Sequence, residues 1–244
     1  MNRDAPMNED ALRERVATAC RVIALEGYVD LTLGHVSARN PGDRTVWIKR
    51  KGVGLDEVEP SDVIALDIDD PTALESADYH LESVMHTEVY RSRPDVGSVI
   101  HGHPVYGTAL GSTDGRLQLL THDAVLFADG IGDYDDGPAL IMNRDQGARV
   151  AMALGSRRAA LLRNHGVVIA GEDVRWAVLA AVTLERAVRI QSIAGTLGKL
   201  RPIPQDGAER LGPQKYQDGF LDEYWAAWVR RVRGRHARER AVVG

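Results

Sequence analysis

Cysteine is almost absent from this sequence, which contains Cys20 and no other. A single cysteine excludes an intrachain disulfide framework and a metal site made of several thiolates, and it is typical of a reducing compartment. No hydrophobic run approaches the roughly 20 residues that a membrane span needs. Residues 1–10 are polar and lack the apolar core of a signal peptide. We therefore expect a cytoplasmic protein that neither spans nor binds a membrane.

Neither sign of charge dominates. The net charge is -5, from 30 basic and 35 acidic residues in 244, so no overall field favours nucleic acid as a partner. The hydrophobic share of 44% is enough for a large globular core. We expect a catalytic domain over residues 1–212. Residues 213–244 are expected to add an amphipathic helix and a basic tail that pack on this domain or on a neighbouring subunit.

Hydrophobic periodicity predicts short strands separated irregularly by helices. This spacing differs from the regular strand–helix alternation of a Rossmann domain, and it favours a mostly antiparallel sheet covered by helices. Asn8 or Asp10 is expected to cap the first helix and Asp173 a long later one. Helices are expected over 8–26, 79–91, 106–110, 146–154, 173–194 and 220–233, strands within 32–39 and over 45–48, 63–68, 98–103, 159–162 and 167–170, and a linker over 202–212.

The pair His101 and His103 is the first chemical signal. Alternate residues of a strand point to the same side, so both imidazoles can reach one metal ion. His165, in an Asn-His-Gly turn after an apolar strand, is a candidate third ligand, and Glu82 is a candidate fourth ligand or acid/base. The alternatives are structural histidines and an exposed helix carboxylate. His86, four residues after Glu82, is expected to support the site. Apolar surroundings are expected to raise the pKa of Glu82 toward neutrality.

A basic loop and further histidines are candidates for substrate contacts. Lys49, Arg50 and Lys51 precede Gly52, and they predict either an anion-binding loop or an ordinary solvated one. His35, His80 and His122 are candidates for the lining of a pocket, whereas His236 is expected in solvent. The acidic stretch 133–136 is interpreted either as a lid or as an exposed loop.

Several segments together resemble the class II aldolase/adducin family, over about residues 9–200. They are Gly34-His35-Val36-Ser37-Ala38-Arg39, Glu82 with His86, residues 91–96 (Arg-Ser-Arg-Pro-Asp-Val), His101-Gly102-His103 and Leu162-Arg163-Asn164-His165-Gly166. The resemblance implies an α/β fold, a three-layer α/β/α sandwich with a central, largely antiparallel sheet. It also implies a homotetramer with sites near subunit interfaces. It implies further that His101, His103 and His165 bind a divalent metal, and that Glu82 ligates this metal at rest and shuttles protons.

The departures from the family concern phosphate binding. His35 stands where the sugar-phosphate aldolases have an asparagine, residues 49–52 replace a Thr-Pro-Ser-Gly loop, and His80-Leu81 replaces a Ser-Ser pair. Cations also suit a carboxylate. Asp123 lies near the position of an aldolase tyrosine, with Tyr134 in the next loop. The sequence therefore resembles more the branch that acts on hydroxylated aromatic carboxylates, such as 3,4-dihydroxyphthalate decarboxylases of aromatic catabolism.

The predicted function is that of a metal-dependent carbon–carbon lyase. It would decarboxylate a hydroxylated aromatic (di)carboxylate through a metal-stabilised, enolate-like intermediate. The metal would be zinc, with Fe2+, Mn2+ or Co2+ as alternatives. A sugar-phosphate or sugar-acid aldolase or epimerase is the alternative activity. A scaffold protein that uses Phe220, Trp225 and Trp228 as a partner surface is the rival from another class. The predicted substrate-binding residues are His35, Ser37, Lys49, Arg50, Lys51, Gly52, His80 and His122, and the predicted catalytic residue is Glu82.

Overall fold

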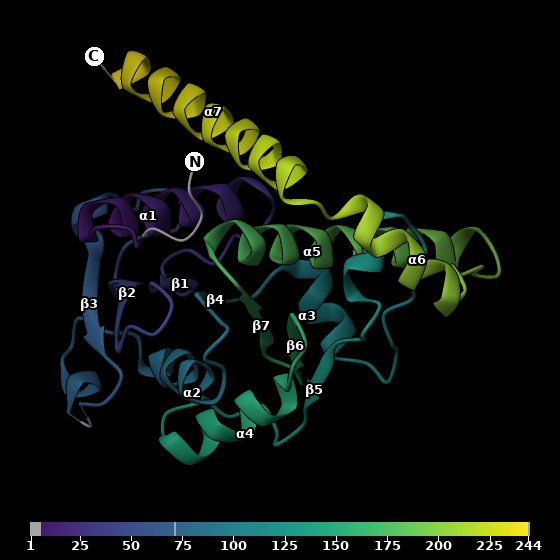
Figure 1. The fold of residues 1–244 in the computed structure, drawn as a ribbon, viewed down its shortest axis with the longest axis horizontal. Coiled ribbons are helices and arrows are strands. Elements are labelled where there is room, and N and C mark those ends of the chain that lie inside the picture. The colour runs from purple at the N-terminus through teal and green to yellow at the C-terminus, as the bar shows by residue number, and fades with distance from the viewer. Residues whose placement is uncertain (1–5, 71, 244) are drawn as a thin grey trace.

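A central sheet lies between two layers of helices in the computed structural model, which describes residues 6–70 and 72–243, with side chains left out at 73 and 236–243 (Figure 1). Within this part of the chain, seven strands follow the order β3-β2-β1-β4-β7-β6-β5. The strands are β1 (His35–Ala38), β2 (Thr45–Lys49), β3 (Val63–Asp67), β4 (Ser98–Gly102), β5 (Gly132–Tyr134), β6 (Ala159–Leu162) and β7 (Gly166–Gly171). Every neighbouring pair is antiparallel except β5 and β6, which are parallel.

The two faces of the sheet carry separate hydrophobic cores. On one face, α1 (Glu9–Leu25) and α5 (Val174–Leu197) cover the sheet, and their apolar stripes meet strand residues such as Ile100. On the other, α2 (Val84–Ser92) and α4 (Arg144–Leu154) pack on residues such as Val99. Figure 1 shows these pairs of helices above and below the strands. The prediction of a three-layer α/β/α sandwich with a largely antiparallel sheet is confirmed.

Two predicted helix starts are confirmed by their caps. The side chain of Asn8 accepts a hydrogen bond from the amide of Ala11, 2.9 Å away. Asp173 likewise accepts from the amides of Arg175 and Trp176. Each cap satisfies amide groups that have no partner inside the helix, so it fixes where the helix begins.

The helix predicted over 79–91 begins later than expected. Residues Leu81–Ser83 form a 3-10 turn, η3, and α2 starts at Val84. The preceding loop is held to the basic loop, because the Lys51 amide donates to the Asp78 carbonyl at 2.7 Å and Arg50 pairs with the Asp78 carboxylate. His80 therefore stays extended, and Glu82 lies on the turn instead of on the helix.

One other prediction from the sequence is wrong. Residues 202–212, predicted as a linker, contain most of α6 (Gln205–Lys215), whose Ala208 is buried. Of the two interpretations of the acidic stretch 133–136, exposure fits its three aspartates, although β5 pairs with β6 and buries Tyr134 between them. Asp135 then pairs with Arg163 at 2.6 Å, and Asp136 pairs with Arg149.

The C-terminal helix α7 (Asp218–Val243) crosses α1 and α5, and its far end extends beyond the body (Figure 1). Trp228 Nε1 donates to Glu26, the residue that caps the end of α1, at 3.2 Å, and Leu221 and Val232 are buried. The boundary proposed at 212 falls inside α6, and residues 1–5 and the side chain of His236 lie outside the described parts. Short 3-10 turns, η1 (Pro60–Asp62), η2 (Ala73–Glu75) and η4 (Asp123–Phe127), and the helix α3 (Val105–Gly111) complete the elements.

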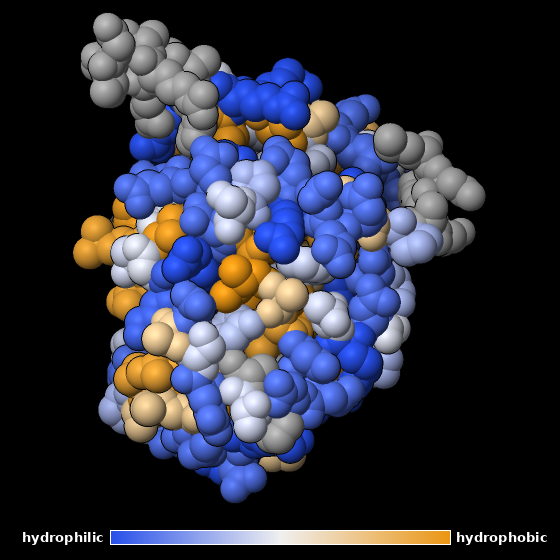
Figure 2. Space-filling model, turned by 90° about the vertical axis from the view of Figure 1, so that its left-hand side faces the viewer, coloured by the Kyte–Doolittle hydropathy of each residue, from blue (hydrophilic) through white to orange (hydrophobic). Residues whose placement is uncertain are grey.

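The outer surface is mainly hydrophilic on the face that presents α1 and β3, with apolar residues in separate patches (Figure 2). None of the helices in the described residues combines the length and apolar character that crossing a bilayer requires.

Candidate metal centre

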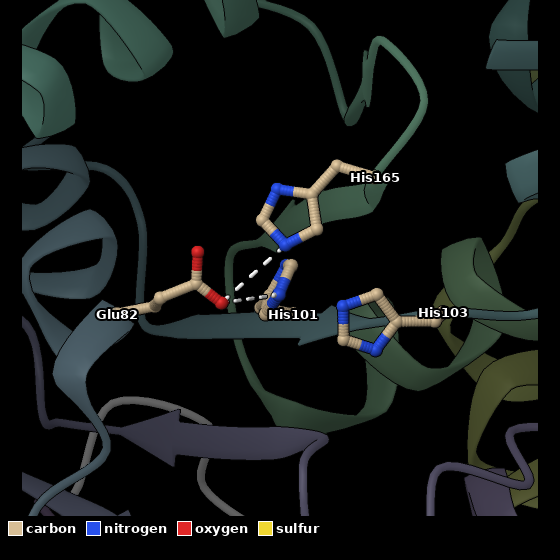
Figure 3. A group of neighbouring side chains, drawn as sticks. All are labelled: Glu82, His101, His103 and His165. Carbon is tan, nitrogen blue, oxygen red and sulfur yellow. Dashed lines mark ion pairs between the residues drawn. The ribbon is translucent and has the colours of Figure 1, made fainter. Parts of the chain in front are cut away.

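Four side chains from separate parts of the chain point toward one another at one end of β4 (Figure 3). Glu82 comes from η3, His101 from β4, His103 from just beyond β4, and His165 from the turn between β6 and β7. One ligand atom from each lies within 4.8 Å of the others. We call these four residues the metal cluster. The structure thus brings together the predicted three histidines and Glu82.

His101 has a buried ring nitrogen without a hydrogen-bond partner. Its Nδ1 lies 3.0 Å from the carbonyl oxygen of Val167, which can only accept, so Nδ1 carries the proton. Burial, which outweighs the attraction of Glu82, lowers the pKa of His101, and the ring is therefore neutral. Nε2 then presents a lone pair, and the Glu82 Oε2 at 3.5 Å is also an acceptor. Two acceptors that face each other without a hydrogen between them fit a bound cation.

His103 is held by Asp30, a residue that the sequence reading missed. Asp30 Oδ2 accepts from the backbone amide of His103 at 2.8 Å and lies 3.3 Å from its Nδ1. Burial opposes the charge of His103, but Asp30 outweighs it and raises the pKa of the imidazole. A carboxylate that binds the outer nitrogen of a metal-ligating histidine orients the ring and increases its basicity. The one signal in the sequence is an acidic residue within the apolar stretch 28–33.

Glycines make room for this arrangement. A Cβ at Gly34 or at Gly102 would lie 2.8 Å from the Asp30 carboxylate oxygen. A Cβ at Gly166 would lie 2.6 Å from the carbonyl oxygen of Gly102 and 2.8 Å from a ring carbon of His103. The preceding Asn164 has a positive φ of 54°, a conformation that asparagine tolerates better than most residues. The Asn-His-Gly turn therefore brings His165 against β4.

Glu82 is fixed at both carboxylate oxygens. Oε1 accepts from the amide of Ile141 at 2.9 Å, and Oε2 lies 3.4 Å from His165 Nε2. Burial on its own would raise the pKa of Glu82, but the His165 imidazole and the Ile141 amide lower it well below its usual value. The expectation of a raised pKa is therefore wrong, because the carboxylate faces imidazoles instead of apolar side chains.

The donor set fits a divalent cation. Three imidazole nitrogens and a carboxylate oxygen are ligands that zinc and other first-row metals bind in proteins. The lone pair of His101 is already aimed into the cluster, and Asp30 supplies the outer hydrogen bond for His103. Among the described residues, the metal cluster is the group of histidine, cysteine or acidic side chains whose ligand atoms lie close enough together to hold a metal ion.

A second group of histidines lies directly beside the metal cluster. The ring centroid of His35 is 5.0 Å from that of His101 and 4.6 Å from that of His80. Its Nδ1 lies 2.7 Å from Nε2 of His86, whose Nδ1 lies 2.6 Å from the Ser37 hydroxyl. The Ser37 hydroxyl is also 2.8 Å from the hydroxyl of Tyr90. We call His35, His86, Ser37 and Tyr90 the relay.

The relay and its neighbours are buried. Ser37 is fully buried and faces the other relay residues, so it lies behind the site. Burial, together with the surrounding imidazoles, lowers the pKa of His35 and of His86 well below the usual value. Burial and the nearby Lys49 ammonium lower the pKa of His80 to about 3. These three imidazoles are therefore neutral at pH 7.

The basic residues at the end of β2 and just after it do not form one anion-binding surface, which was one of the two alternatives that the sequence left open. Lys49 is 0% exposed, and its ammonium lies within 3.3 Å of the carbonyl oxygens of Thr32 and Arg50 and of His80 Nε2. Three acceptors occupy its three protons, and burial lowers its pKa. Arg50 pairs with Asp78 at 3.0 Å, while Lys51 is exposed.

The last two predicted substrate residues lie in exposed turns. Gly52 follows Lys51 with a φ of 87°, which explains the glycine. His122 is exposed, and the adjacent Asp123 pairs with Arg186 of α5 and Lys215 of α6. The structure therefore places His122 with α5 and α6, apart from the other histidines named above.

Residues 14–192 match the family described as Class II Aldolase and Adducin N-terminal domain. The chain is 32% identical over 221 residues to a 3,4-dihydroxyphthalate decarboxylase of Arthrobacter keyseri, covering 85% of this chain and 88% of the relative. It is also 32% identical over 211 residues to a 4-hydroxy-3-prenylphenylpyruvate oxygenase/4-hydroxy-3-prenylbenzoate synthase of Streptomyces roseochromogenus subsp. oscitans, covering 83% and 75%. Among solved structures, an L-fuculose 1-phosphate aldolase from Glaciozyma antarctica PI12 superposes with a TM-score of 0.80 at 22% identity, covering 95% and 92%.

Proposed function

The chain belongs to the class II aldolase and adducin family, and from this premise we propose that it is a metal-dependent carbon–carbon lyase that decarboxylates a hydroxylated aromatic carboxylate. The observation that carries the proposal is the 32% identity to a 3,4-dihydroxyphthalate decarboxylase along most of both chains. The replacement of the family's phosphate-binding residues by His35 and His80 supports a substrate that is not a phosphate ester.

We propose that His101, His103 and His165 hold a divalent cation, with zinc as the first candidate, and that Glu82 is the fourth ligand at rest. The support is the convergence of their four ligand atoms and the unpartnered Nε2 of His101. When bound, the cation supplies a Lewis acid that withdraws electrons from substrate oxygens next to the bond that breaks.

Glu82 is the proton carrier in this proposal. Its lowered pKa means that it begins as a carboxylate, so it can accept the proton of a substrate hydroxyl. Glu82 would then return this proton to the ring carbon that bears the carboxylate, which gives a dienone-like intermediate and restores the Glu82 carboxylate. The carbon–carboxylate bond breaks next, carbon dioxide leaves, and its electron pair restores the aromatic ring with the hydroxyl oxygen as a phenolate, which takes up a proton from water. The Ile141 amide holds one carboxylate oxygen in place throughout.

The position of the cluster suggests how copies of the chain assemble. Val29 and Leu31 are 77% and 86% exposed, and they flank Asp30, which holds His103. Leu33, just before β1, and Val105, just after β4, also have exposed side chains. Apolar surface of this kind is typical of an interface. We propose a cytoplasmic homotetramer in which this apolar rim meets a neighbouring subunit beside the site.

A sugar-phosphate aldolase is the second candidate, and the fold shared with an L-fuculose 1-phosphate aldolase favours it. In that reaction the metal cluster keeps its role, and a basic side chain such as the exposed Lys51 binds the phosphate. Lys49 cannot do so, because its three protons are used inside the chain.

Product analysis on zinc-loaded protein separates the two candidates. The protein is given 3,4-dihydroxyphthalate in one reaction and a ketose 1-phosphate in another, with and without dioxygen. The proposal expects carbon dioxide from the first reaction, equally in both atmospheres, and no dihydroxyacetone phosphate from the second. Dihydroxyacetone phosphate alone would favour the aldolase. Product that requires dioxygen would contradict a simple lyase and favour an oxygenase, as one relative is named.

A further inference from the structure

We infer that the relay fixes the tautomer of His35, so that His35 presents an N–H donor beside the metal cluster and selects substrates that place an acceptor oxygen there. The hydrogen bonds of the relay do not depend on the proposed function. The identity of the substrate that supplies the acceptor oxygen does rest on the proposed function. His35 would be the residue that contacts substrate, and Ser37, His86 and Tyr90 would be positioning residues.

The relay is continuous over three short hydrogen bonds. Tyr90 meets Ser37 at 2.8 Å, Ser37 meets His86 Nδ1 at 2.6 Å, and His86 Nε2 meets His35 Nδ1 at 2.7 Å. All four side chains are at most 1% exposed. Because water does not reach these atoms, each proton must be shared within the chain of bonds.

The direction of the bonds follows from Tyr90. Its phenol is buried, and burial raises its pKa, so it keeps its proton. The guanidinium of Arg39 stacks on the Tyr90 ring and offers donors only. Among the described residues, Ser37 is the side chain that Tyr90 Oη meets, so the phenol donates to it. The Ser37 hydroxyl proton is then free to donate to His86 Nδ1.

The direction of donation in the last bond, between the two histidines, follows from the Ser37 donor. His86 Nδ1 accepts, so the ring proton sits on His86 Nε2, which donates to His35 Nδ1. His35 must then carry its own proton on Nε2. Both rings are neutral in this arrangement, because an N–H···N bond needs a lone pair. No described carboxylate pairs with either ring, and a buried charge without a partner is costly.

His35 Nε2 is consequently a donor, on a ring that lies beside the metal cluster. Antiparallel pairing sets His35 opposite His101, and their ring centroids are 5.0 Å apart. No other described group forms a hydrogen bond with His35 Nε2. A phenolate, carboxylate or carbonyl oxygen of a substrate satisfies this donor, whereas a protonated amine is rejected because two donors would face each other.

The first test reads the tautomer directly. Long-range proton–nitrogen NMR on the zinc-loaded full chain, labelled with nitrogen-15 in histidine, distinguishes protonated from bare ring nitrogens. His35→Gln and His86→Gln assign the two sets of signals. We expect protonated Nε2 and bare Nδ1 for both histidines. A proton on Nδ1 of His35 in the native protein would overturn the inference.

Ser37→Ala tests the relay, and Ser98→Ala is its matched control. Both serines are fully buried on paired strands, and Ser98 donates to the Ser37 carbonyl at 2.8 Å without joining the relay. We expect Ser37→Ala to mix the two tautomers of His35 and Ser98→Ala to keep the native one. An unchanged His35 tautomer in a folded Ser37→Ala protein would show that the relay does not set it.

The second test measures binding of 3,4-dihydroxybenzoate to zinc-loaded protein by calorimetry. We expect His35→Leu to weaken binding roughly 10-fold to 100-fold, as the loss of a hydrogen bond to a charged oxygen implies. His35→Gln, which keeps an N–H, is expected to stay within about threefold of the native affinity. Equal losses in both variants would overturn the donor role. No binding by the native protein would overturn the substrate class and leave the tautomer assignment standing.

Discussion

The metal cluster and the relay are two groups of histidines on the same side of the sheet, and their hydrogen bonding differs. In the metal cluster, the lone pair of His101 faces the carboxylate of Glu82 with no hydrogen between them. In the relay, the contact atoms of His35 and His86 pair at 2.7 Å. The partners of each ring nitrogen, more than the residue type, therefore distinguish a candidate metal ligand from a structural histidine.

The two groups are nevertheless joined by the fold. His35 and His101 are opposite each other in the β1–β4 register, and their rings connect the two groups. Substitutions at residues away from this pair therefore test each group separately. The largest effect is expected for Glu82, the member of the metal cluster that we propose as the proton carrier.

Glu82→Gln should reduce turnover by about 100-fold to 10,000-fold, the usual contribution of a general acid or base. The amide can neither accept nor deliver the proton, while the three histidines are still expected to bind metal. Steady-state kinetics and metal analysis on the same sample check both statements. Glu88→Gln is the matched control, because Glu88 is a buried glutamate of α2 that pairs with Arg91 and Arg144. Near-native turnover in Glu82→Gln would remove Glu82 from the mechanism.

Asp30→Asn should weaken metal affinity by roughly 10-fold to 100-fold, as is typical when the outer partner of a ligating histidine is lost. The neutral amide no longer favours the orientation and basicity of His103. Competition with a zinc chelator measures the change. Asp173→Asn serves as the control, since asparagine caps a helix as well as aspartate does. If both variants bind zinc like the native chain, the pairing of Asp30 with His103 has no role in the metal site.

The smallest effect concerns stability and pH. His86 stays neutral in the folded protein because its pKa is lowered, whereas in the unfolded chain it takes up a proton below about pH 6.5. Acidification therefore favours unfolding. Between pH 7 and 5.5, the free energy of unfolding of the metal-free native protein should fall by about 1 kcal/mol more than that of His86→Gln. Chemical denaturation at both pH values, with exposed His122→Gln as control, tests this. An equal loss in His86→Gln and native protein would mean that His86 is charged when folded.

Local signals explain which parts of this structure could be predicted. The His-x-His strand end and the caps Asn8 and Asp173 depend on residues close in sequence, and so they could be predicted from the sequence. Asp30 was not, because its partner His103 lies 73 positions away. The helix α6 was hidden by Gly207, Gly212 and Pro213, residues that usually interrupt helices.

The arrangement of the basic residues 49–51 could not be predicted, for a different reason. Lysines are rarely buried, so a sequence with three neighbouring cations favours a solvent-exposed loop. Lys49 is buried because Thr32, Arg50 and His80 supply three acceptors, and two of these lie far from it in the chain. The same contacts withdraw Lys49 from substrate binding, which no local pattern could reveal.

Metal content measured on the native protein, on His101→Ala and on His86→Ala tests the central comparison most directly. Each protein is loaded with zinc, passed through a desalting column and analysed for bound metal, with its fold checked by circular dichroism. We expect one zinc per chain for the native protein and for His86→Ala, and almost none for His101→Ala. Zinc retained by a folded His101→Ala, or lost from a folded His86→Ala, would contradict the division of these histidines into ligands and relay.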